Sequence, residues 1–130
     1  MACGHRPLSM KQFVHSPDPS DELPTGENCH ILEVWNNETD NAVSLARARL
    51  EPGMTTKLHR LKGVDERYLI MAGTGIARVG DSGPVEVRPG DMVIIPSGIS
   101  QQISNSGKDD LVFLCVCTPR FTRECYEALE

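Results

Sequence analysis

Short apolar stretches alternate with turn residues along most of this chain. From residue 29 onward, segments rich in Val, Ile and Leu recur about every 8 to 12 residues and are closed by Gly, Pro, Asn or Asp. No long stretch with a 3.6-residue period separates them, which disfavours a parallel βαβ architecture. The pattern predicts an all-β sandwich or barrel. The expected strands lie within 29–37, 42–53, 55–61, 66–73, 75–81, 84–90, 91–98, 100–107 and 110–117.

The two ends of the chain differ from this pattern. Residues 16–28, "SPDPSDELPTGEN", combine three prolines with several acidic residues, which is typical of a loop or arm. In "TPRFTRECYEALE", Phe121, Cys125 and Leu129 fall at i, i+4 and i+8, which predicts a helix. We therefore expect an arm over 1–28, a barrel over 29–118 and a C-terminal helix over 119–130 that closes one barrel end or contacts a second copy.

Length and charge narrow the class of protein. A chain of 130 residues fits one domain. Its net charge of −5 and the lack of a Lys/Arg block argue against a surface that binds nucleic acids in general. No apolar run approaches the roughly 20 residues of a membrane span, and the N-terminal basic residues have no apolar stretch behind them as a signal peptide would. The expected compartment is the cytoplasm, with no membrane or nucleic-acid partner.

The five cysteines are odd in number, which favours reduced thiols over a disulfide framework. Cys115 and Cys117 would share one face of a strand. A thiolate pair on a metal ion is conceivable there, but small apolar filling of the interior is the favoured interpretation, because free cysteine is among the most buried residue types.

Two spaced motifs carry the main chemical signal. They read Gly53-x5-His59-x-Leu61-x4-Glu66-x6-Gly73 and Gly90-x5-Pro96-x-Gly98-x2-Gln101-x3-Asn105. Over residues 43 to 117 this pattern resembles the two motifs of the cupin family. The resemblance implies a double-stranded β-helix, or jelly roll, and makes a small single-domain cupin the expected architecture.

Strand alternation predicts which motif residues share a face. His59 and Leu61 share one face of their strand, as Glu66 and Tyr68 do on theirs. Gln101, Ile103 and Asn105 do the same on a third. The resemblance implies that His59, Leu61, Glu66 and Gln101 converge at the barrel mouth.

In metal-binding cupins three histidines and a glutamate hold the ion, whereas this chain places Leu61 and Gln101 at two of the histidine positions. The remaining candidate ligands for a divalent Zn, Mn, Fe or Ni ion are His59, Glu66 and Gln101, and an amide oxygen is a weak ligand. The metal, acting as a Lewis acid, would support isomerase, lyase or decarboxylase chemistry on a small anionic metabolite, with His59 and Tyr68 as candidate acid–base groups.

Two other functions stay open at this point. The pocket could bind a small molecule without metal, with His59 as the acid or base and Glu66 orienting it. The barrel could also serve only as a scaffold.

Further candidates for substrate contact surround the motifs. Arg47 and Arg49 lie two residues apart on one strand face; facing inward they would clamp a carboxylate, and facing outward they would form a solvated surface. Leu61, Gln101 and Ile103 are expected in the pocket wall. A homodimer is expected as well, with residues 29–37 as the likeliest contact because both faces of that strand carry apolar side chains.

Overall fold

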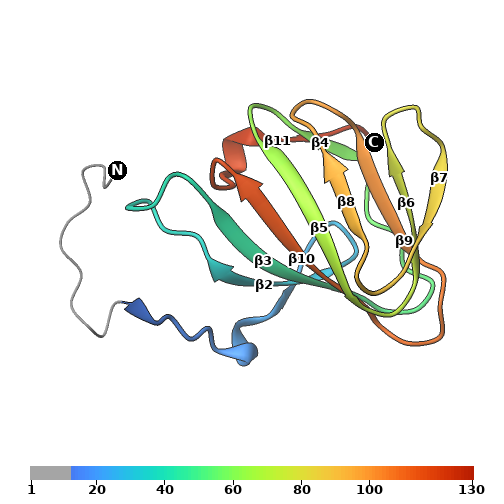
Figure 1. Cartoon of the computed structure of the whole chain (residues 1–130), viewed down its shortest axis with the longest axis horizontal. Coiled ribbons are helices and arrows are strands. Elements are labelled where there is room, and N and C mark those ends of the chain that lie inside the picture. Colours follow the sequence, from blue (N-terminus) through green and yellow to red (C-terminus); the bar gives the residue numbers. More distant parts are fainter. Residues whose placement is uncertain (1–12) are drawn as a thin grey trace.

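The chain folds into two antiparallel β-sheets that face each other (Figure 1). The computed structural model describes residues 13–130. One sheet has the order β1 (Leu23–Pro24), β2 (His30–Trp35), β3 (Ser44–Leu50), β10 (Leu111–Thr118), β5 (Asp65–Ala72) and β8 (Met92–Ile95). The other has the order β11 (Tyr126–Ala128), β4 (His59–Leu61), β9 (Gln101–Asn105), β6 (Gly75–Val79) and β7 (Pro84–Val87). The predicted all-β jelly roll is confirmed.

Alternation along the strands determines what faces the interior. In β10 every second residue is buried, from Leu111 through Phe113 and Cys115 to Cys117. The alternation predicted for the motif strands is present as well: Glu66 and Tyr68 are buried on β5, and the motif residues of β4 and β9 are buried on theirs. The two-residue period of a strand therefore delivers the motif side chains to the inside.

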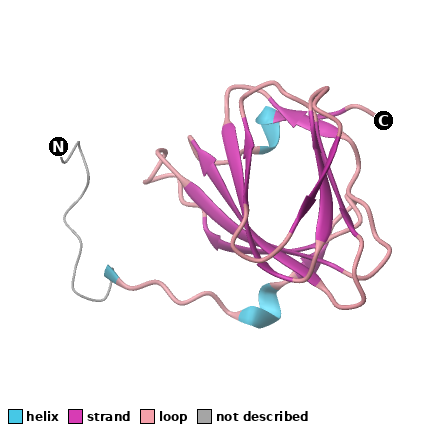
Figure 2. Cartoon of the chain, turned by 45° about the vertical axis from the view of Figure 1, so that its right-hand side comes forward, coloured by secondary structure: helices cyan, strands magenta, loops and turns pink. Residues whose placement is uncertain are grey.

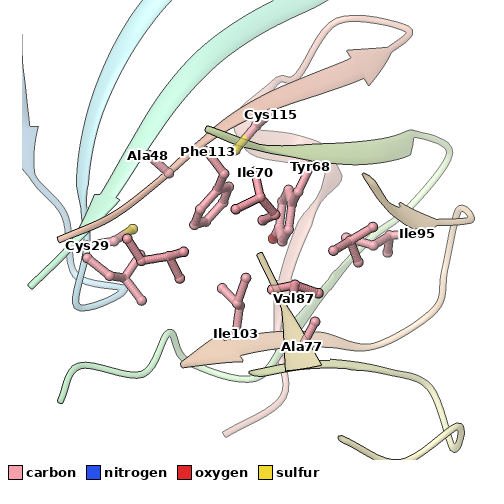
Figure 3. Packing of buried hydrophobic residues seen from close by; sticks show 13 residues of the cluster. Cys29, Ala48, Tyr68, Ile70, Ala77, Val87, Ile95, Ile103, Phe113 and Cys115 are labelled. Atoms are coloured by element: carbon pink, nitrogen blue, oxygen red, sulfur yellow. The ribbon is translucent and has the colours of Figure 1, made fainter. Parts of the chain in front are cut away.

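The main core lies between the two sheets at the end away from β11. Figure 3 shows its side chains converging from β3, β5, β10 and the opposing sheet. Phe113 lies at its centre, tilted against the ring of Tyr68 with the ring centroids 4.5 Å apart. A second, smaller cluster joins Leu61, Val64, Cys117 and Cys125. All four cysteines of the described residues are free and buried, in agreement with the thiol interpretation.

Contacts on both sides of Pro19 hold the N-terminal segment to the barrel. A 3₁₀ turn, η2 (Pro19–Asp21), is capped by the Asp18 side chain, which accepts a hydrogen bond from Ser20 N. The Glu22 carboxylate accepts hydrogen bonds from Arg49 at 2.8 Å and from Arg47 at 3.4 Å. Before η2, the His15 ring packs edge-on against Trp35 of β2 with the ring centroids 5.4 Å apart, and η2 itself lies at the lower edge of the barrel in Figure 2. The arm is thus held to β3 by charge, and β1 continues it into the sheet.

The predicted C-terminal helix is wrong. Residues Arg123–Cys125 form a single 3₁₀ turn, η3, and β11 then pairs with β4. Strand β4 would otherwise leave one row of backbone donors and acceptors unpaired at a sheet edge, and β11 satisfies them. The helical spacing was misleading: Phe121 and Cys125 pack in the small cluster, whereas Leu129 is exposed.

The homodimer expected through residues 29–37 stays a prediction. Within the single chain, Leu32 is already buried and Trp35 Nε1 donates a hydrogen bond of 2.9 Å to Asp40 Oδ2.

No helix within residues 13–130 has the length and apolar character of a membrane span.

Two glycines with positive φ offer a matched test of this architecture. A Cβ at Gly73 (φ +79°) would lie 2.5 Å from Asp110 O, whereas one at Gly53 (φ +82°) would meet nothing within 4 Å. We expect Gly53→Ala to lower the free energy of unfolding by about 1 kcal/mol through backbone strain alone. Gly73→Ala should lower it by about 3 kcal/mol, because the strand ends must also move apart. Denaturant unfolding measures both, and equal losses would contradict the close approach.

Candidate functional site

A cavity of about 960 Å³ opens between the inner face of the six-stranded sheet and strands β4 and β11. Four predicted site residues line it: His59, Leu61, Glu66 and Tyr68. All four come from the first motif, and none of the second-motif residues that His59 was expected to meet, Gln101 included, lines the cavity. Its volume is within the range of small-molecule sites in proteins.

His59 presents one ring nitrogen to this cavity. The residue is 5% exposed, and its Nδ1 lies 2.7 Å from the carbonyl oxygen of Lys57. A carbonyl only accepts, so Nδ1 carries the proton and donates. In the neutral ring Nε2 then holds a lone pair, and it makes no hydrogen bond to any residue of the range 13–130. Fixing the tautomer in this way prepares Nε2 to bind a ligand or accept a proton.

Two residues that the motifs do not include surround the imidazole. Tyr126 of β11 stacks on it, with ring centroids 5.1 Å apart and planes at 23°. The Glu27 Oε1 atom lies 3.4 Å from His59 Nδ1. Tyr126 pairs with Leu61 across β11 and β4, so it reaches His59 as a diagonal neighbour on the same face. Sequence analysis missed both because one lies in the arm and the other in the tail expected to be helical.

Glu66 and Gln101 form the buried polar wall beside His59. The Tyr68 hydroxyl donates a hydrogen bond to Gln101 Oε1, which leaves the amide Nε2 without a partner among the described residues. Cys117 Sγ donates to Glu66 Oε2 at 3.6 Å. Burial raises the pKa of Glu66, and the Gln101 amide and His59 oppose that rise in part. The neutral acid form of Glu66 is therefore favoured at higher pH than in water.

The pKa of Glu27, the second carboxyl group beside His59, is also raised. Burial raises the pKa of Glu27, while His59 and the nearby Tyr126 hydroxyl lower it. Burial and Glu27 together raise the pKa of Tyr126 to about 12, so its hydroxyl stays a hydrogen-bond donor. The two carboxyl groups beside His59 thus carry less negative charge than they would in water.

Comparison with known proteins decides the family. The family model described as a cupin domain matches residues 46–117. The chain is a cupin. It is 38% identical over 93 residues to an oxalate-binding protein of Thermotoga maritima, and the matched region covers 69% of this chain and 73% of the relative. It is 36% identical over 125 residues to an uncharacterized protein of Methanocaldococcus jannaschii, spanning 95% of this chain and 99% of the relative.

Solved structures agree with this assignment. A predicted oxalate decarboxylase from Thermotoga maritima superposes with a TM-score of 0.69 at 28% identity, over 80% of this cupin and 98% of that chain. The nucleoside dehydratase Pac13 superposes with a TM-score of 0.74 at 12% identity, over 90% of this cupin and 92% of that chain. The second likeness concerns the fold alone.

The donor set of this cupin does not fit a resident metal ion. Within residues 13–130, no three His, Cys, Asp or Glu side chains lie close enough to share one. Leu61 offers a hydrocarbon, and the Gln101 oxygen that could serve as a ligand is engaged by Tyr68. His59 and Glu66 alone leave two protein donors, fewer than the three or four of typical transition-metal sites.

Four residues expected to contact substrate do not line the cavity. Arg47 and Arg49 face away from the cavity and bind Glu22, because Ala46 and Ala48 take the inward positions of β3. Ile103 is fully buried in the main core, one alternate position beyond Gln101, and does not line the cavity. Gln101 itself is 1% exposed and lies behind the lining residues.

The burial of Glu66 leads to a pH-dependent stability. A glutamate whose pKa is raised on folding favours the native state below its unfolded pKa and opposes it as pH rises through the folded value. We therefore expect Glu66→Gln to stabilise the protein at about pH 7, with the gain shrinking toward about pH 4.5. Urea unfolding across this interval measures the effect. Glu38→Gln, at an exposed carboxylate, is the control, and a pH-independent difference for Glu66→Gln would contradict the assignment.

Proposed function

We propose that this cupin binds a small carboxylic acid in its cavity without a resident metal ion, with His59 as the main polar contact. The observation that carries the proposal is the state of His59, which is 5% exposed. Its Nδ1 is hydrogen-bonded to Lys57 O, so its Nε2 is free for a ligand. The relative named as an oxalate-binding protein supports a small anion as the ligand class. Protonated His59 would donate from Nε2 to a carboxylate, a charge-assisted hydrogen bond.

Carboxyl groups in the cavity are compatible with an anionic ligand when they are protonated. The raised pKa values of Glu27 and Glu66 favour the neutral acid, which can donate a hydrogen bond to a bound carboxylate. The Tyr126 hydroxyl is a further donor, and Arg120 and Arg123 line the cavity wall. Binding would then take up protons, so affinity is expected to rise as pH falls.

A metal-dependent isomerase, lyase or decarboxylase is the rival proposal. It is supported by the shared cavity position of His59 and Glu66, which are the two motif ligands that this cupin retains. In that case the ion would need ligands from substrate or water at most of its positions. Metal content separates the two proposals.

Restoring the missing ligands provides the sharpest metal test. We expect the purified wild-type protein to hold well under one transition-metal ion per chain, as measured by inductively coupled plasma mass spectrometry. The double variant Leu61→His/Gln101→His should bind Zn²⁺ or Ni²⁺ stoichiometrically, because it supplies three imidazoles and one carboxylate. Each single variant, one ligand short, is the matched control. Stoichiometric metal in the wild type that is lost in His59→Ala would overturn the proposal.

Direct binding tests the role of His59. Titration calorimetry with oxalate should show saturable binding that weakens by about tenfold or more in His59→Ala, since a charge-assisted hydrogen bond contributes about 1.5–3 kcal/mol. His30→Ala, whose ring contacts Glu51 at the surface, should bind as the wild type does. Affinity should rise from about pH 8 to about pH 5.5 as cavity groups take up protons. Equal affinity in both variants would contradict the assignment.

A further inference from the structure

The cavity is larger than a two-carbon acid requires. Its volume of about 960 Å³ corresponds to sites that hold drug-sized ligands. The polar groups described above occupy only one side of it. The remaining space must therefore be explained by the side chains that line the other half.

Strand register shows how that space arises. Glu66 pairs with Cys117 and Cys117 with Ser44, which forms one row across β5, β10 and β3. In the next row Tyr68 pairs with Cys115 and Cys115 with Ala46. On β10 and β3 each row thus continues through small side chains, and the second row ends at Glu33 of β2. Large residues at these positions would have filled the space.

The floor made by these rows extends from the polar groups to the far strand of the sheet. From β5 across β10 and β3 to β2 there are three strand spacings, or about 14 Å. At its far end lie Ile31 of β2 and Leu23 of β1, both in the cavity lining. Leu23 is 65% exposed, so this end is open, and Asp21 and Glu33 line it beside the two apolar side chains.

The walls over this floor are rich in aromatic rings. Phe113 lines the cavity next to Tyr68, and Phe121 lines it from the segment before η3. Tyr126 contributes a third ring beside His59. Flat apolar groups pack well against such rings, with about 0.5–1.5 kcal/mol per aromatic pair beyond the area buried.

We infer that the ligand of this cupin is a carboxylic acid with an apolar body of aryl size. The inference rests on the proposed function, because it takes the acid group to lie at His59 and Glu66. The body then lies over Cys115, Ala46 and Ala48 and points toward Ile31, which pairs with Ala48. The unpartnered Nε2 of the buried residue His59 fixes the polar end, and the small-residue floor sets the length of the apolar end.

A ligand series on the wild-type protein tests this without any substitution. Titration calorimetry compares acetate, oxalate, hexanoate and 3-phenylpropionate under one buffer condition. We expect 3-phenylpropionate to bind at least about tenfold more tightly than acetate, because burying its ring adds apolar contact. If acetate and oxalate bind as tightly as the longer acids, the inference is overturned while the proposed function stands. If no acid binds, the proposed function itself fails.

A substitution on the floor locates the body of the ligand. Ala46→Leu fills the half-buried position next to Cys115 and should weaken 3-phenylpropionate by about tenfold while leaving oxalate within about twofold. Val116→Leu, which adds bulk on the opposite face of β10, is the matched control and should change neither affinity. Thermal unfolding of each variant verifies that it is folded.

Light scattering distinguishes a second possible occupant of the apolar half. If Ala46→Leu changes the molar mass of the protein and leaves 3-phenylpropionate binding unchanged, a second copy covers this floor and the inference is overturned. Unchanged mass with selective loss of the aryl acid supports it.

Discussion

Strand β10 is the constraint on which the rest of the structure depends. It pairs along its length with β3 on one side and β5 on the other, so the register of those two pairings fixes which side chains lie in a row. A shift of one residue would turn Glu66 and Tyr68 outward and bring arginines inward. The buried alternation of Leu111, Phe113, Cys115 and Cys117 opposes such a shift, because each carries apolar surface into the interior. Core packing and site geometry are therefore set by the same strand.

The same register accounts for how this cupin differs from a metal protein. Gln101 and Leu61 occupy positions that alternation directs inward, yet neither acts as a free donor to a metal ion. Tyr68, buried on β5, donates to the amide oxygen of Gln101 and so decides which end of that amide remains available. Leu61 joins the small apolar cluster with Val64 and Cys125. The polar wall left beside His59 is suited to hydrogen bonding and proton exchange.

Most of the barrel could be predicted from the sequence because strands follow a local rule. The two-residue period and the turn residues located the expected strands and the inward faces of His59, Glu66 and Gln101. The tail was misjudged because Phe121, Cys125 and Leu129 satisfy helical spacing, while the unpaired edge of β4 that attracts β11 is a tertiary feature. The inward face of β3 was ambiguous because its alanines and its arginines each recur every second residue, so alternation alone does not decide which set faces the interior. The partners Glu27 and Tyr126 could not be found at all, because no spacing links an arm to a tail.

The surroundings of His59 depend on two segments that lie far apart in the sequence. Glu27 precedes every strand of the motifs, and Tyr126 follows the last of them, yet both contact or flank the same imidazole. Contacts between such distant segments form only after the intervening loops have closed. A nascent chain that has left the ribosome only as far as Asn105, where the second motif ends, still lacks the Tyr126 ring that stacks on His59. The imidazole environment is thus a marker of the folded barrel, since it is complete only when β11 has paired with β4.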